Sequence, residues 1–142
     1  MMKKRYLPLR IILGGVSLAH ISIGITGVIP VIPLDIAIRF YGASLTVTPQ
    51  IEHITEMFGA YMLTVGLLAA FAVRDPVKNM FVIYGVSFLL FVRVIQRLFY
   101  AGQAFEVFAI SPAWYWVQTV FFLAIAVSLI LFRPKVSKSN NA

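Results

Sequence analysis

The sequence predicts an all-α fold: an integral membrane four-helix bundle with a short interfacial segment between spans one and two. Of the 142 residues, 61% are hydrophobic and 12% are charged, and the mean hydropathy is +0.92. Soluble domains have about twice that share of charged residues. The hydrophobic residues gather in stretches of about 20, the length with which a helix crosses a hydrocarbon core of about 30 Å. One transmembrane domain is expected over residues 1–142.

Polar or turn-forming segments separate the predicted spans. The spans cover residues 11–32, 52–73, 79–100 and 112–132. The first follows Lys3-Lys4-Arg5, as the core of a signal peptide would. Its apolar run is too long for such a core, and no small-x-small cleavage site follows it. We therefore expect an uncleaved first span.

Residues 34–50 form the longest connection and join the first two spans. They are too apolar for a free loop, so an interfacial or re-entrant segment is predicted. Asp35 and Arg39 are four residues apart and could pair on a short helix.

The last connection, residues 101–110, is expected to be a short loop that holds Glu106. Ser111 followed by Pro112 is typical of a helix start, with the serine as the N-cap. The polar residues at 134–142 are expected to form a disordered tail.

Basic residues flank the spans unevenly. Nine of the twelve lie in the N-terminal tail, the 74–78 turn and the C-terminal tail. The two opposite connections hold only Arg39. Cytoplasmic loops of membrane proteins are enriched in Lys and Arg, so both termini are predicted to face the cytoplasm. The net charge of +7 is explained by this topology and does not indicate a nucleic-acid partner.

Small residues form a stripe along the first span. Ser17, His20, Gly24 and Gly27 share one helical face, where a neighbouring helix could approach closely in lipid. His20 has two interpretations: a packed histidine bonded to a neighbouring helix, or a pocket or proton-handling group.

Acidic residues open the second span and basic residues close the third. When this hairpin is folded about its turn, Glu56 lies level with Gln96 and next to Arg97, and Arg93 lies one turn deeper, level with Gly59. A charge in lipid is costly, so intramembrane charges usually pair. Arginine can bind a carboxylate through two parallel hydrogen bonds, so Glu56 is expected to pair with Arg97 or Arg93.

This cluster has two interpretations. In the first it is a polar cavity, in which Gly59 leaves room for the guanidinium of Arg93. The candidate ligand-binding residues are Glu56, Arg93, Arg97, Gln96, His20, His53 and Gln118. Two arginines against one deep glutamate leave spare positive charge, which suits an anionic or carbonyl-bearing ligand such as a lipid headgroup or a quinone. In the second, the charges form an ion pair that fixes helix register and binds nothing.

The sequence lacks the residues that disulfide, iron–sulfur and metal chemistry would require. The chain has no cysteine, which excludes disulfides, iron–sulfur ligation and cysteine-based zinc sites. Glu52-His53-x-x-Glu56 superficially resembles a metal motif, but a di-iron bundle needs a Glu-x-x-His on two helices and two further carboxylates. No metal site and no resident cofactor are predicted, beyond a possible quinone or lipid.

Three features together resemble the DoxX-like superfamily, and most closely its small four-span branch. They are Glu-x-x-x-Glu-Met-Phe-Gly-Ala-Tyr at 52–61, Arg-Asp-Pro at 74–76 and Arg-x-x-x-Arg at 93–97. The resemblance covers roughly residues 52–132. It implies a four-helix membrane bundle in the bacterial plasma membrane. Some members are associated with quinone-linked or oxidative-stress complexes.

The function expected first is an accessory or ligand-binding subunit with an outward-facing polar pocket for a lipid or quinone. Its partners would be membrane lipids, other membrane subunits or further copies of the chain. One alternative is a membrane enzyme on a lipid-like substrate, with Glu56 and His20 moving protons. Another is a small oligomeric transporter, which the position of the acids near the span ends disfavours.

The substitutions Ser44→Cys and Ser137→Cys test the topology in a chain that has no native cysteine. We expect a membrane-impermeant thiol reagent to label the first from outside intact cells and the second only after permeabilisation. Labelling of both from outside would contradict four spans with both ends in the cytoplasm.

Overall fold

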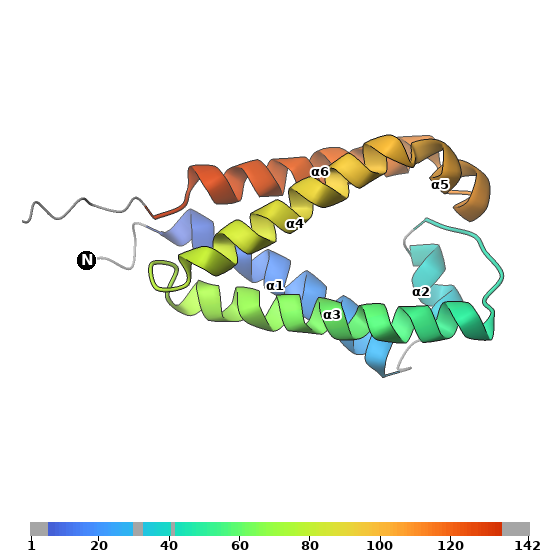
Figure 1. The fold of residues 1–142 in the computed structure, drawn as a ribbon, viewed down its shortest axis with the longest axis horizontal. Coiled ribbons are helices and arrows are strands. Elements are labelled where there is room, and N and C mark those ends of the chain that lie inside the picture. The colour runs from blue at the N-terminus through green and yellow to red at the C-terminus, as the bar shows by residue number, and fades with distance from the viewer. Residues whose placement is uncertain (1–5, 30–32, 41, 135–142) are drawn as a thin grey trace, which may run out of the picture.

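The computed structural model describes residues 6–29, 33–40 and 42–134, and these residues form helices and connections without a β-strand (Figure 1). The helices are α1 (Leu7–Val28), α2 (Leu34–Phe40), α3 (Pro49–Arg74), α4 (Met80–Phe99), α5 (Ala101–Phe108) and α6 (Pro112–Leu131). In this described part, α1, α3, α4 and α6 are long and apolar enough to cross a membrane. The predicted all-α bundle is confirmed, and the chain is a multi-pass membrane protein. The predicted disordered tail falls almost wholly outside the described residues.

The spans match the prediction closely, and proline marks the first turn of both α1 and α6. α1 begins at Leu7, earlier than predicted, because Pro8 lies in its first turn, where the missing N–H is not needed. α6 begins at Pro112 as predicted, although the side chain of Ser111 makes no capping hydrogen bond.

Two short helices lie at the same end of the bundle (Figure 1). α2 is the predicted segment between the first two spans, but neither ion pair of the described residues joins Asp35 to Arg39. The prediction of a loop over 101–110 was wrong, because residues 101–108 form α5. Phe105 of this helix packs edge-on against Tyr115, with ring centroids 5.1 Å apart. This tertiary contact favours a helix where the local sequence suggested a loop.

The four spans form two tightly packed pairs, α1 with α3 and α4 with α6, and the contacts between the pairs are far fewer. Figure 1 shows that the pairs meet beside the turn between α3 and α4 and diverge toward α2 and α5. We call these the turn end and the splayed end. The first residues of α1 and the last residues of α6 also lie at the turn end (Figure 1).

The small-residue face of α1 packs against α3, as its pattern predicted. A Cβ added at Gly24 would lie 2.5 Å from the backbone nitrogen of Leu63. One added at Gly27 would lie 2.8 Å from the Cα of Gly59. Because neither site has room for a side chain, the two backbones themselves are in contact. Close backbone packing of this kind holds helices together in lipid, where there is no hydrophobic force between them.

Each pair also contains one buried serine that bonds across to the partner helix. Ser17 Oγ donates to the carbonyl oxygen of Gly66 over 2.8 Å, and Ser87 Oγ donates to that of Ala126 over 2.9 Å. Interhelical hydrogen bonds in membranes contribute on the order of 0.6–2 kcal/mol each. These bonds therefore reinforce the pairing of α1 with α3 and of α4 with α6.

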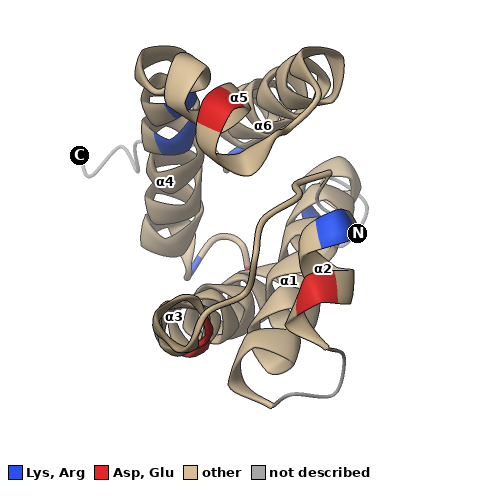
Figure 2. Ribbon diagram, turned by 90° about the vertical axis from the view of Figure 1, so that its right-hand side faces the viewer, with Lys and Arg blue, Asp and Glu red and all other residues tan. Residues whose placement is uncertain are grey.

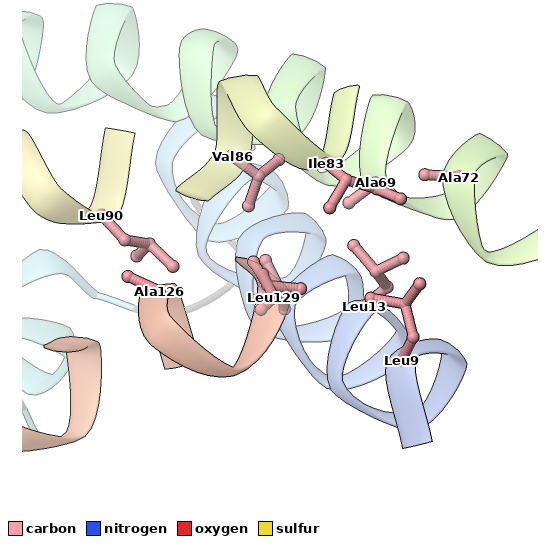
Figure 3. Close-up of a cluster of buried hydrophobic side chains, with 10 residues drawn as sticks. Leu9, Leu13, Ala69, Ala72, Ile83, Val86, Leu90, Ala126 and Leu129 are labelled. Atoms are coloured by element: carbon pink, nitrogen blue, oxygen red, sulfur yellow. The ribbon is translucent and has the colours of Figure 1, made fainter. Parts of the chain in front are cut away.

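A hydrophobic cluster joins the two pairs at the turn end (Figure 3). Its buried members are Leu9, Leu13 and Val16 of α1, Ala69 and Ala72 of α3, Ile83, Val86 and Leu90 of α4, and Ala126 and Leu129 of α6. The Nη2 of Arg10 also donates to the carbonyl oxygen of Arg74 over 3.1 Å. All four spans are thus tied together at one end, which leaves the two pairs free to separate at the other.

The substitution Gly24→Leu should lower the melting temperature in detergent, because a side chain would force apart backbones that are in contact. Overpacking of this kind typically costs about 1–3 kcal/mol. Gly14→Leu is the matched control, since a Cβ at Gly14 meets nothing within 4 Å. Equal melting temperatures for the two variants would contradict the α1–α3 contact.

Candidate functional site

A groove of about 660 Å³ opens between α3 and α4, where the two helix pairs diverge. Most of its wall is apolar or aromatic, and its polar groups come mainly from α4. It is lined by Phe58, Tyr61, Met62 and Val65 of α3, by Leu89, Val92, Arg93, Gln96 and Arg97 of α4 with Tyr100 after it, by Gln103, Ala104 and Phe108 of α5, and by Ile110 and Tyr115. We call this the arginine groove.

Arg97, in the last turn of α4, is bound to one face of α6. Its Nε donates to Thr119 Oγ1 over 2.7 Å. Its Nη2 donates to the carbonyl oxygen of Tyr115 over 2.7 Å and to Gln118 Oε1 over 3.2 Å. These three bonds fix the plane of the guanidinium. Within the described part of the chain, Nη1 makes no hydrogen bond, so its two N–H groups are the ones that a ligand could use.

Aromatic rings of α6 also lie under both arginines of the groove. The Cζ of Arg97 is 3.7 Å from the ring centroid of Tyr115, and the Cζ of Arg93 is 4.8 Å from that of Phe122. The Tyr115 hydroxyl donates in return to the carbonyl oxygen of Arg97 over 2.8 Å. A cation held over an aromatic face is stabilised by the ring quadrupole, the more so when water is excluded. α6 thus places an aromatic ring against each of the two cations.

Sequence reasoning identified only one of the four α6 residues that hold these arginines. Tyr115, Gln118, Thr119 and Phe122 share one helical face, at i, i+3, i+4 and i+7. Only Gln118 was a candidate. The signal available was this face itself: three side chains with polar groups and an aromatic ring in an otherwise apolar helix.

The acidic candidate residues lie outside the arginine groove. Glu56 and His53 are neighbours on α3, with Oε2 and Nδ1 3.6 Å apart, and their side chains are 63% and 73% exposed. Glu56 also lines a separate cavity of about 570 Å³, together with Glu52 and Asp35. Figure 2 views the splayed end and shows that α4, α5 and α6 are set apart from α1, α2 and α3. Glu56 and Arg97 therefore line different cavities, whereas Arg93 also lines a small cavity that shares part of its wall with the acidic one.

The expected Glu56–Arg97 pair is not formed. Among residues 6–29, 33–40 and 42–134, neither ion pair includes Arg97, and its hydrogen bonds all go to α6. The predicted depths were sound, since Phe58 and Gln96 line the same groove. The pair fails because α3 packs mainly against α1 and has far fewer contacts with α4.

Gly59 has a different role from the one expected. Its Cα approaches that of Gly27 too closely for any side chain, so the space serves helix packing. Arg93 is nevertheless level with Gly59 as predicted, since both line a small cavity of about 230 Å³ together with residues of α2.

His20 is buried, and its Nδ1 lies 2.8 Å from the carbonyl oxygen of Val16 in its own helix. A Cβ at Gly66 would meet Ile21, so His20 is level with that part of α3. Glu56 precedes Gly66 by ten residues, which is about 15 Å along a helix. This separation is too large for direct proton transfer between Glu56 and His20.

In the described part of the chain, no group of three or more His, Asp or Glu residues could hold a metal ion. Comparisons of the chain with protein-family models, with curated proteins and with solved structures found no match. The relation to the DoxX-like superfamily therefore stays a prediction from the residues of the second and third spans.

Arg97→Gln should lower the melting temperature, whereas Glu56→Gln should change it little. The first change removes hydrogen bonds from a charged donor, each worth about 1.5–3 kcal/mol. The second removes an exposed contact, and such contacts contribute about 0–1 kcal/mol. Both variants are measured by thermal unfolding in detergent, with Arg39→Gln on the exposed α2 as the matched arginine control.

The double variant Glu56→Gln/Arg97→Gln should lose the sum of the two single losses, because the residues belong to separate clusters. Recovery of stability in the double variant would mean that the two side chains are coupled, contrary to the observed arrangement.

Proposed function

We propose that this protein is an accessory membrane subunit that binds an amphiphile, a lipid or a quinone, in the arginine groove. The head of the amphiphile would offer anionic or carbonyl oxygens to Arg97. One observation carries the proposal: every hydrogen-bond acceptor of Arg97 in the described part is neutral. The guanidinium is held rigidly, yet these acceptors leave its charge uncompensated.

An oxygen-bearing head suits this guanidinium. The two N–H groups of Nη1 can donate to oxygens of a carboxylate, a phosphate or a carbonyl, and a fixed guanidinium loses little entropy when it binds them. The amides of Gln96 and Gln103 line the same groove and offer further donors. The head would therefore be selected by donors from α4 and α5.

The opposite wall suits a hydrocarbon. Phe58, Tyr61 and Met62 of α3 face the groove, and Tyr61 is 67% exposed. The volume of about 660 Å³ falls within the range of ordinary small-molecule sites, roughly 300–1,000 Å³. An amphiphile would satisfy both walls at once, because its head meets the arginine while its tail meets the aromatic residues.

The depth of Arg97 agrees with such a ligand. It lies in the last turn of α4, and the end of a spanning helix is expected at the level where lipid headgroups meet the hydrocarbon core. We also propose that this end faces outward from a bacterial plasma membrane. The support is the basic residues Arg10, Arg74, Lys78 and Arg133 at the opposite end, and the DoxX-like pattern of the second and third spans.

Mass spectrometry of the lipids that co-purify with the protein tests this proposal. The wild-type protein should retain an amphiphile that is enriched over the bulk lipid extract. The Arg97→Gln variant should not retain the amphiphile, because the contact between the guanidinium and the head is removed. The Tyr61→Ala variant should also fail to retain the amphiphile, because an apolar contact with the tail is removed. This change leaves the hydrogen bonds of Arg97 in place.

The matched control is Phe88→Ala, which truncates an equally exposed aromatic residue of α4 that does not line the groove. Phe88→Ala and Glu56→Gln should both retain the amphiphile. A lipid content that matches the bulk extract, or equal retention in Tyr61→Ala and Phe88→Ala, would contradict the proposal.

A further inference from the structure

The arginine groove does not end at its apolar wall. A second cavity of about 410 Å³ continues along the seam between α3 and α4, and Val65 and Leu89 line both. It extends to Leu68 on α3 and to Gly85 and Phe81 on α4. We call it the apolar trough, because all of the residues that line it are apolar.

The trough runs past the middle of the membrane. α4 extends from Met80 to Phe99, with Arg97 in its last turn and Phe81 in its first. Sixteen residues separate Arg97 from Phe81, which is about 24 Å at 1.5 Å per residue. Half of a hydrocarbon core of 30 Å is only about 15 Å. A tail that fills the trough from a head at Arg97 must therefore cross the bilayer midplane.

Gly85 keeps the trough open on the α4 side. A Cβ placed there would meet nothing within 4 Å, in contrast to the glycines of the α1–α3 contact. Its neighbours across the seam, Leu68 and Val65, offer only hydrocarbon. A headgroup from the opposite leaflet would find no polar partner along this wall, whereas a hydrocarbon tail would find contacts throughout.

We infer that the amphiphile of the arginine groove has a tail of polyisoprenoid length, which lies in the apolar trough and reaches past the midplane. The inference rests on the proposed function and names its ligand class. The shared chemistry is a polyisoprenoid chain with an oxygen-rich head. Two sources fit it: a polyprenyl phosphate, whose head is anionic, and a long-tailed quinone, whose head carries carbonyl oxygens.

The test compares tails that share one head. The protein is placed in phosphatidylcholine nanodiscs that contain matched mole fractions of geranyl phosphate or decaprenyl phosphate, and bound ligand is counted by native mass spectrometry. Short-tailed and long-tailed ubiquinones form the second arm. Wild-type protein should bind the long-tailed member of at least one arm about tenfold more tightly, because each additional buried methylene group adds affinity.

Gly85→Phe places a ring at the wall of the trough, at a position where an added Cβ meets nothing within 4 Å, and Gly15→Phe is the matched control at an equally open position of α1. Gly85→Phe should abolish the preference for the long tail and leave short-tail binding unchanged, while Gly15→Phe should behave as wild type. If tail length has no effect, or if the trough holds only phosphatidylcholine or a second copy of the chain, the inference is wrong while the proposed function stands. If neither head binds at any tail length and no phosphatidylcholine is retained either, the proposed function itself is wrong.

Discussion

The backbone contact between α1 and α3 is the constraint on which the rest of the structure depends. Gly24 and Gly27 face Leu63 and Gly59 at distances that exclude any side chain. In lipid, close packing of this kind decides which helices pair, since burying apolar surface gains nothing there. α3 therefore packs against α1 along its length. It remains joined to α4 only near the turn end, and the seam between α3 and α4 stays open toward the splayed end.

This pairing decides how the intramembrane charges are stabilised. A charged side chain in a span is costly unless it is paired or solvated. Because Glu56 lies on α3, it does not form an ion pair with Arg97. The guanidinium of Arg97 is held by α6 instead, through the Thr119 hydroxyl, the Tyr115 carbonyl and the Tyr115 ring. All of these partners are neutral. The arginine is thus held in place by neutral groups, and this observation supports the proposed binding site over an ion pair that only fixes helix register.

Much of the fold was predictable from sequence, because span length and the stripe at Ser17, Gly24 and Gly27 depend on local periodicity. Arg93, Gln96 and Arg97 were also correctly grouped, since they share one end of α4. The Glu56–Arg97 pair was wrong because sequence neighbours were assumed to be packing partners. Tyr115, Thr119 and Phe122 were missed for the same reason: their role depends on which helix α6 meets. α5 was missed because its stabilising contact, Phe105 against Tyr115, is tertiary.

The central claim, that two helix pairs diverge from a shared core, is tested most directly by distances between spin labels on α3 and α4. One pair of labels replaces Phe71 and Phe81 near the turn end, and a second replaces Ile54 and Leu98 near the splayed end; all four side chains are exposed. Double electron–electron resonance in nanodiscs should give a longer distance for the second pair than for the first. Equal distances would mean that α3 and α4 form a closed hairpin, which would remove the arginine groove and contradict the account.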